Sequence, residues 1–334
     1  MSEKTIQKTP SGRIIRYDFA RAICMLWIVG FWHMCSGYLG IKVHENSFLG
    51  TFTSGILAVF FYMSARLSSK AHIERFSDAW AYIKHRFIAI YPLYLISAAT
   101  MIFIPFKNFG ANLKLFLMSA TCLNIFFPPM IKTLWFLTIL LLFYLITPIF
   151  LSTLKTRTKI LIALSIYAVL IVENLAFGQF DPRLVTYFPV YILGLFISQQ
   201  TENNILKLRY FLISLPILIL TLYLISTKEE TSVFISLIFV FVKQLFLLSY
   251  IVFLLMICEW LSKIKPLYRI FYTISFTSTF AYLFHRQYFG LWKRFFNIFP
   301  IWLAYLVILP SLLVLSYFGQ KLYTMLIKKI EKKN

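Results

Sequence analysis

Charged residues are scarce in this chain of 334 residues. They make up 13% of the sequence, whereas hydrophobic residues make up 60%. A water-soluble protein of this length needs more polar surface, because water must solvate its outer face. Helices that face lipid need an apolar outer face instead. The composition therefore excludes a soluble globular domain and indicates an integral membrane protein.

Acidic residues are the scarcer of the two charged classes. Asp and Glu number 12 against 33 Lys and Arg, which gives a formal net charge of +21. In a soluble protein this excess would suggest nucleic-acid binding. Here the basic residues lie in short segments between apolar runs, which is where topology signals are found. The basic residues are not interleaved with aromatic ones, so we expect no nucleic-acid partner.

Cysteine is also rare, and its spacing excludes two kinds of stabilisation. The four cysteines all fall within apolar segments and none forms a CxxC pair, so we expect no structural disulfide, no zinc site and no other metal. The polar and basic stretch 1–16 precedes an apolar run without a small-residue cleavage site. We therefore expect a cytoplasmic N-terminal tail over 1–16, followed by an uncleaved membrane anchor.

Long hydrophobic runs are what the sequence has in abundance. The predicted fold is all-α: a polytopic transmembrane helix bundle of about ten spans, because crossing a bilayer takes ~20 apolar residues. The transmembrane domain is expected over 17–327, with a basic cytoplasmic tail over 328–334. A shorter apolar segment, 112–128, stops at Pro128-Pro129 and predicts a re-entrant or outer-surface element. The predicted spans lie near 18–39, 48–66, 87–106, 134–154, 160–176, 184–198, 209–226, 232–261, 270–292 and 301–325.

The distribution of basic residues tests this topology. With the N-terminus inside, 23 of the 33 Lys and Arg residues fall on the inner side, nine fall on the outer side, and Lys243 lies within a span. This bias agrees with the positive-inside rule. If 112–128 were a full span, the basic tract Lys155–Lys159 and the basic C-terminus would move outside. The sequence therefore favours ten spans with both termini cytoplasmic.

Ionisable residues inside the first span are the first candidates for function, since such residues are costly in a membrane. Asp18 and Arg21 are three residues apart and share one helix face. His33 lies about 18 Å further along an α-helix, beyond the membrane midplane. The alternative is a histidine that is simply hydrogen-bonded within the bundle.

Two arginines lie at the inner membrane edge, Arg66 and Arg86. Either they are anchors that extend their charged ends to the interface, or they bind an anionic cytosolic ligand, because guanidinium groups hold phosphates well. Trp135 is an interface aromatic or part of a site. His285 lies near the outer end of the ninth predicted span.

Five short elements occur in order along these spans. They are Asp18-x-x-Arg21 with His33, Phe60-Phe61-x-x-Ser64, Arg86 with Tyr91-Pro92 and Tyr94, Leu134-Trp135-Phe136-Leu137 with Tyr144 and Pro148, and Tyr282-Leu283-x-His285. Together they resemble the membrane acyltransferase-3 family, over about residues 14–290.

The chain departs from the family pattern in four respects, one of which is that the glutamate that some members carry after Leu134-Trp135 is missing. Eleven residues separate Arg21 from His33, where the family usually has ten. One residue rotates a helix position by about 100°, which a π-bulge or a different register of Arg21 would have to absorb. Ala65 stands where glycine is usual, and Ala89 stands where a second arginine is common.

The resemblance implies transfer of an acyl group, often acetyl, from cytosolic acyl-CoA to a hydroxyl. The acceptor would be an extracytoplasmic or lipid-linked carbohydrate of the bacterial envelope. The enzyme would be a multi-pass protein of the inner membrane. His33 would be the catalytic base, since imidazole titrates near neutral pH. Arg21, Arg66 and Arg86, with Arg16 as a further option, would hold the CoA phosphates. Five further residues would support the site or bind the acceptor: Asp18, Ser64, Trp135, Tyr282 and His285.

No tightly bound cofactor is expected beyond the acyl-CoA substrate. Two other functions remain open: a glycan or lipid transporter, and a catalytically silent relative in which the extra residue has displaced His33. The identity of the acceptor, the acyl group and the oligomeric state are not specified by the sequence.

Overall fold

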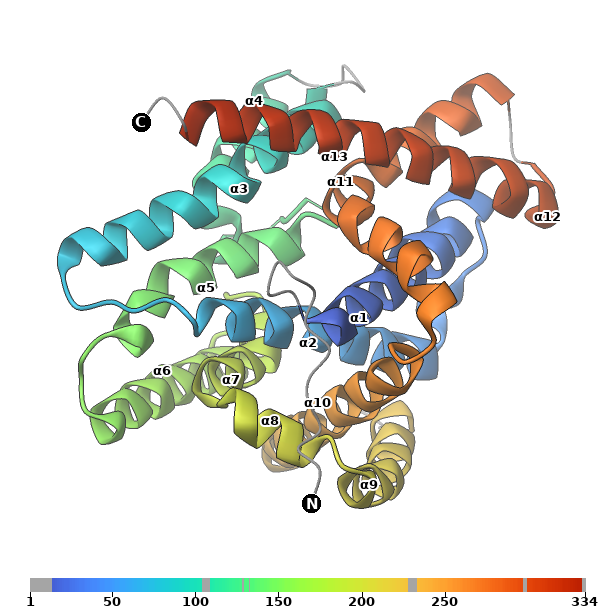
Figure 1. The fold of residues 1–334 in the computed structure, drawn as a ribbon. Helices are drawn as coiled ribbons and strands as arrows, with labels where there is room; N and C mark the ends of the chain where they lie inside the picture. The colour runs from blue at the N-terminus through green and yellow to red at the C-terminus, as the bar shows by residue number, and fades with distance from the viewer. Residues whose placement is uncertain are drawn as a thin grey trace. The chain divides into compact units, whose positions relative to one another are not determined.

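The computed structural model describes residues 14–103, 109–127, 129–131, 133–227, 233–296 and 299–331. All regular elements within these ranges are helices, as Figure 1 shows, so the all-α prediction is confirmed. Residues 1–13 of the expected N-terminal tail lie outside the described part, while Ile15 and Arg16 already belong to the first helix. The last helix continues to Glu331, so most of the expected tail over 328–334 is helical and 332–334 lie outside the description.

In chain order the elements are α1 (Ile15–Met25), the π-helix η1 (Leu26–Leu39), the 3-10 helix η2 (Val43–Glu45), α2 (Ser47–Ser68), α3 (Phe76–Phe103), α4 (Phe109–Ala120), the 3-10 helix η3 (Leu123–Ile125), α5 (Trp135–Leu151), α6 (Thr156–Ala176), α7 (Arg183–Phe196), α8 (Gln199–Ile205), α9 (Leu208–Ser226), α10 (Val233–Leu261), α11 (Lys265–Phe296), α12 (Ile301–Leu303), the π-helix η4 (Ala304–Ile308) and α13 (Leu309–Glu331).

Within the described ranges, seven helices are long and apolar enough to cross a bilayer. They are Ile15–Leu39, Ser47–Ser68, Phe76–Phe103, Thr156–Ala176, Leu208–Ser226, Ile235–Leu261 and Ile301–Lys329. The other three predicted spans correspond to two shorter apolar helices, α5 and α7, and to α11, which has 32 residues but is more polar. The chain is therefore a multi-pass membrane protein.

The side chains that α6 and α9 leave exposed are apolar. Leu161 and Val169 of α6 are each 63% exposed, and Leu220 of α9 is 58% exposed. Contiguous apolar faces of this kind are rare on soluble monomers. These helices present the surface that lipid would cover.

Helix α3 begins earlier than the sequence pattern indicated. The predicted span started near 87, but the helix starts at Phe76, so Arg86 lies in a helix rather than at the end of an inner loop. Asp78 explains the early start, because its Oδ2 accepts hydrogen bonds from the backbone N–H groups of Arg75 at 2.9 Å and Glu74 at 3.1 Å. A carboxylate that binds N–H groups ahead of the first turn stabilises a helix start.

Over 112–127, the described part of this segment, no helix reaches membrane-spanning length. Helix α4 has 12 residues, or about 18 Å at 1.5 Å per residue. A hydrocarbon core of about 30 Å is thicker than that.

The chain forms two compact units, each built from segments far apart in the sequence. The first comprises Met1–Phe60, Ser198–Lys228 and Leu245–Leu326. The second comprises Phe61–Ile197, Glu229–Gln244 and Ile327–Asn334.

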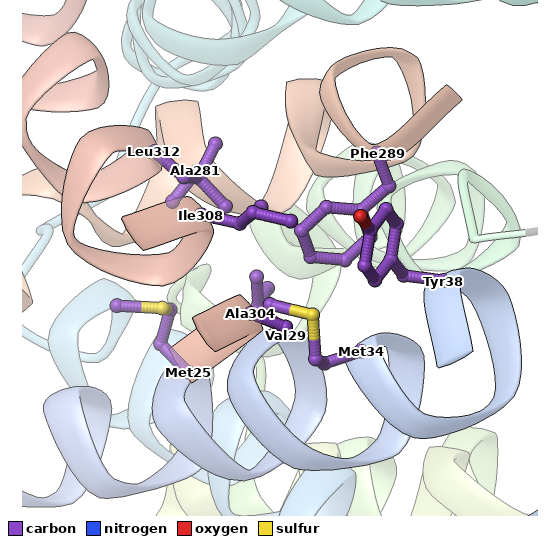
Figure 2. Close-up of a cluster of buried hydrophobic side chains, with 9 residues drawn as sticks. All are labelled: Met25, Val29, Met34, Tyr38, Ala281, Phe289, Ala304, Ile308 and Leu312. Atoms are coloured by element: carbon purple, nitrogen blue, oxygen red, sulfur yellow. The ribbon is translucent and has the colours of Figure 1, made fainter. Parts of the chain in front are cut away.

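In the first unit, the N-terminal helix packs along α11 in the same direction. Phe19 stacks on Phe271 with ring centroids 4.5 Å apart, and Tyr38 lies 6.1 Å from Phe289. Figure 2 shows the apolar cluster that completes this core, to which α1, η1, α11, η4 and α13 contribute Met25, Val29, Met34, Tyr38, Ala281, Phe289, Ala304, Ile308 and Leu312. The packed core fixes how α1 and α11 lie against each other.

In the second unit, Phe61 is fully buried among aromatic rings. Its ring centroid lies 4.7 Å from that of Phe136 and 4.7 Å from that of Tyr187. Helix α7 approaches α2 closely at Gly194, where an added Cβ would lie 2.7 Å from the carbonyl oxygen of Tyr62 and 2.8 Å from Cβ of Ala65. Only glycine fits this position without a shift of backbone.

The close approach at Gly194 gives a stability prediction. Gly194→Ala forces the Tyr62 carbonyl away, and such overpacking typically costs about 1–3 kcal/mol. The matched control is Gly290→Ala, because nothing lies within 4 Å of a Cβ built there and alanine is the better helix former. We expect thermal unfolding in detergent to show a lower midpoint for Gly194→Ala and an unchanged or higher one for Gly290→Ala. Equal midpoints for the two variants would contradict the close contact.

Candidate functional site

Two histidines lie face to face in the first unit. The rings of His33 in η1 and His285 in α11 have centroids 4.6 Å apart and planes 6° apart. His285 is fully buried and His33 is 8% exposed. The two residues are 252 positions apart in sequence, and the parallel packing of α1 and η1 on α11 brings them together. The sequence alone named both residues but did not predict their contact.

Each of the two rings carries a nitrogen without a hydrogen-bond partner among the described residues. Nδ1 of His285 lies 2.7 Å from the carbonyl oxygen of Tyr282 and 3.3 Å from that of Ala281, while its Nε2 has no partner. Nδ1 of His33 is also buried without a partner. Buried polar atoms without partners are rare in native proteins and are often found where a substrate or water binds.

The extra residue between Arg21 and His33 lies in a segment with an unusual helix type. From Leu26 to Leu39 the chain is a π-helix of 14 residues. A π-helix holds more residues per turn than an α-helix and is frequent at functional sites. The insertion is accommodated in this segment, and His33 still faces α11. A π-helix is one of the two features that the sequence comparison named for this segment.

Asp18 and Tyr282 support this pair from the helices that carry it. Asp18 is buried, and its Oδ1 accepts a hydrogen bond of 3.0 Å from Oγ of Ser275 on α11. The Tyr282 ring lies 6.0 Å from that of His285. Because Asp18 lies on α1 and Ser275 on α11, Asp18 links the two helices that position the histidines.

Arg21, a further candidate on α1, is half-buried.

Arg16, considered above as a ligand for CoA phosphates, is held by carboxylates instead. It is buried; its Nη2 lies 2.7 Å from Oε1 of Glu202, and its Nη1 lies 3.4 Å from Oε2 of Glu259. Tyr17 Oη also donates to Glu202. A guanidinium already paired in this way is a poor site for a phosphate. The sequence did not predict this ion pair. Its signal was the scarcity of acidic residues, because each of the few carboxylates, Glu202 and Glu259 among them, is a candidate partner for a buried arginine.

Arg66 and Ser64 lie near the end of α2, in the second unit. Arg66 is buried, and its Nη1 donates a 2.6 Å hydrogen bond to Oγ of Ser69. The Ser64 carbonyl accepts a 2.8 Å bond from Oγ of Ser68. Ala65 faces Gly194 of α7. The small residue that allows close packing is therefore supplied by the opposite helix.

Arg86 lies between two tyrosine rings of the second unit. Its guanidinium carbon is 5.4 Å from the ring centroid of Tyr82 and 5.3 Å from that of Tyr144. In the described ranges of the chain, Arg86 has no carboxylate within ion-pair distance. Aromatic faces hold a cation in place without neutralising it. Arg86 is therefore a positioned cation that can still bind an anion.

Trp135 lies in an aromatic and ionic stack in the second unit. The guanidinium carbon of Arg183 is 4.0 Å from its ring centroid, and Tyr187 stacks on it at 6.0 Å. Arg183 is itself paired with the buried Asp181. The sequence did not predict this ion pair. Because Arg183 and Tyr187 both pack on Trp135, its observed role is to hold α5 and α7 together.

The buried Arg16–Glu202 pair gives a second stability prediction. Glu202→Ala leaves the buried guanidinium with only the more exposed Glu259 as a carboxylate partner, and removing one partner of a buried ion pair typically costs about 3–5 kcal/mol. Glu259→Ala is the matched control, because this side chain is 31% exposed and contacts the same arginine at 3.4 Å; such a pair is worth about 0–1 kcal/mol. We expect a large fall in the thermal midpoint of the purified protein for Glu202→Ala only. Similar small changes in both variants would contradict the central role of Glu202.

Comparison with known proteins agrees with the resemblance noted in the sequence. The family model described as an acyltransferase domain, Acyl_transf_3, matches residues 14–319. No curated protein and no solved structure matches the chain significantly. The family match covers both units and includes every candidate site residue. On this evidence the chain belongs to the acyltransferase-3 family of membrane acyltransferases.

Proposed function

We propose that this protein transfers an acyl group, in the first place acetyl, from cytosolic acyl-CoA to a hydroxyl of an extracytoplasmic or lipid-linked carbohydrate. The observation that carries the proposal is the buried, stacked pair of His33 and His285, with an unpartnered nitrogen on each ring. Membership of an acyltransferase family supports the reaction class. Acid–base groups held in a site without bulk water suit the transfer of a thioester-bound acyl group.

The reaction requires a group that accepts one proton. The hydroxyl oxygen attacks the thioester carbonyl carbon, the C–S bond breaks, and CoA leaves as a thiolate. The hydroxyl proton passes to a base and then to the thiolate or to water. We assign this chemistry to the histidine pair, with His33 as the residue that the first-span element implies.

The donor requires cations for the CoA phosphates. Arg86 suits this task, because Tyr82 and Tyr144 position it and no carboxylate in the described ranges neutralises it. Arg66 and Arg21 are further candidates on the same side of the predicted topology. Arg16 is removed from this role, since Glu202 pairs with it.

The proposal includes ten spans with both termini cytoplasmic. Helix directions in the first unit support this count. The contacts Phe19–Phe271 and Tyr38–Phe289 show that α1 and α11 run in parallel, as the first and ninth spans must. Gly30 faces Leu309, and Cys35 faces Tyr305, so the last span is antiparallel to the first. Counting α4 as a span would make α11 the tenth and reverse its direction.

Removal of His33 tests the proposed reaction. We expect His33→Ala to lower the release of free CoA from acetyl-CoA by at least about 100-fold, because the variant removes one ring of the histidine pair at which proton transfer is proposed. The measurement uses purified protein in lipid, with acetyl-CoA alone and with carbohydrate acceptors. His44→Ala is the matched control, since His44 is an exposed histidine in η2.

The outcomes of this assay separate the alternative functions. Wild-type protein that carries a glycan or lipid across vesicles and leaves the thioester intact would support a transporter. Protein that neither binds nor consumes acyl-CoA would support a catalytically silent relative. Full turnover by His33→Ala would remove His33 from the mechanism.

Removal of the Arg86 cation tests the proposed donor site. We expect Arg86→Gln to raise the KM for acetyl-CoA about 10-fold or more with a smaller change in kcat, because hydrogen bonds to charged groups contribute about 1.5–3 kcal/mol. Lys84→Gln is the control, since Lys84 lies two residues away on the same helix and is exposed. Equal KM values for the two variants would place the CoA phosphates elsewhere.

A further inference from the structure

His285 has a defined tautomer in this structure, and the reason is local to α11. Its Nδ1 lies 2.7 Å from the backbone carbonyl oxygen of Tyr282. A carbonyl oxygen can only accept, so Nδ1 carries the hydrogen and donates it. In neutral imidazole the other nitrogen, Nε2, then holds a lone pair. That atom is buried and has no partner among the described residues.

His33 lacks such an orienting partner. Its Nδ1 is buried without a hydrogen bond in the described part of the chain, so no backbone group fixes which nitrogen carries the proton. A general base works best when a second group holds its ring and tautomer. By this criterion the ring prepared to accept a proton belongs to His285.

The stacked geometry restricts how the two rings share charge. With planes 6° apart, the ring nitrogens lie in two parallel layers, and neither ring points an N–H at the other. Two imidazolium ions at 4.6 Å in a buried site would repel each other strongly. The pair therefore holds at most one extra proton during the reaction.

We propose that His285 is a second catalytic histidine and that its Nε2 takes the proton of the acceptor hydroxyl. This inference rests on the proposed acyl transfer. As the hydroxyl oxygen bonds to the thioester carbon, its proton moves to Nε2 and the C–S electrons go to the CoA sulfur. The imidazolium keeps its Nδ1–H bond to the Tyr282 carbonyl, and it then returns the proton to the thiolate.

His33 remains neutral in this scheme. Its Nδ1 makes a hydrogen bond to the reacting group, and its ring lies against the imidazolium face of His285. The binding of the hydroxyl would also satisfy the unpartnered Nε2 of His285. Both histidines are then needed, but only His285 must titrate.

The same substitution at both positions tests this assignment. Asparagine places its amide N–H near the position of Nδ1 and has no counterpart of Nε2. His285→Asn thus keeps the bond to Tyr282 and removes the proposed base, so we expect a loss of acyl transfer of at least about 100-fold. We expect His33→Asn to keep activity within about 10-fold of the wild type, since it still donates a hydrogen bond. A larger loss in His33→Asn than in His285→Asn, or equal losses, would overturn the assignment.

A spectroscopic measurement tests the tautomer without relying on turnover. Nitrogen-15 NMR of histidine-labelled protein in lipid distinguishes a protonated ring nitrogen from a bare one. The His285→Asn spectrum, subtracted from that of the wild type, isolates the His285 signal. We expect protonated Nδ1 and bare Nε2, and the opposite tautomer would overturn the proposal. A wild-type protein that consumes no acyl-CoA would refute the proposed function, whereas an active wild type with an equally active His285→Asn variant would refute only this inference.

Discussion

The parallel packing of the N-terminal helix on α11 is the contact on which the candidate site depends. Phe19 with Phe271 and Tyr38 with Phe289 fix its two ends, and the histidine pair lies between them. Aromatic rings bury large areas and prefer defined geometries, so they set both the distance and the register of the two helices. A residue gained or lost in either helix would rotate one histidine away from the other. In the π-helix η1, His33 faces His285 of α11.

A second constraint is that polar groups inside a membrane protein must find partners within the chain. Arg16 is paired with Glu202, and Arg183 with Asp181. Glu173 accepts hydrogen bonds from the backbone N–H groups of Gln179 and Phe180, which lie just beyond its own helix. Among the described residues, Nδ1 of His33 and Nε2 of His285 are buried without a hydrogen-bond partner, and Arg86 lies against the rings of Tyr82 and Tyr144.

Part of the fold and of the site could be predicted from the sequence. Apolar runs of membrane-spanning length identified the helices, because lipid imposes the same requirement on each span locally. Their ends were less predictable: α3 begins at Phe76, since the Asp78 cap acts through hydrogen bonds that hydropathy does not register. Among the site residues, His33 and His285 were named from separate motifs. Trp135 was also named, but its partner Arg183 was missed, because a cation over a ring leaves no periodic signal.

What the sequence by itself determined is the membrane-embedded, all-helical class and the family, since composition, run length and ordered motifs are properties of the linear chain. What only the tertiary structure decided is which polar groups meet. Helices of similar hydropathy give no sign of which faces they share. Three contacts join residues from different helices: the stacking of His33 on His285, the ion pair of Arg16 with Glu202, and the close approach of Ala65 to Gly194. Each depends on how apolar helices pack in three dimensions, and packing is decided by shape complementarity across the whole core rather than by local pattern.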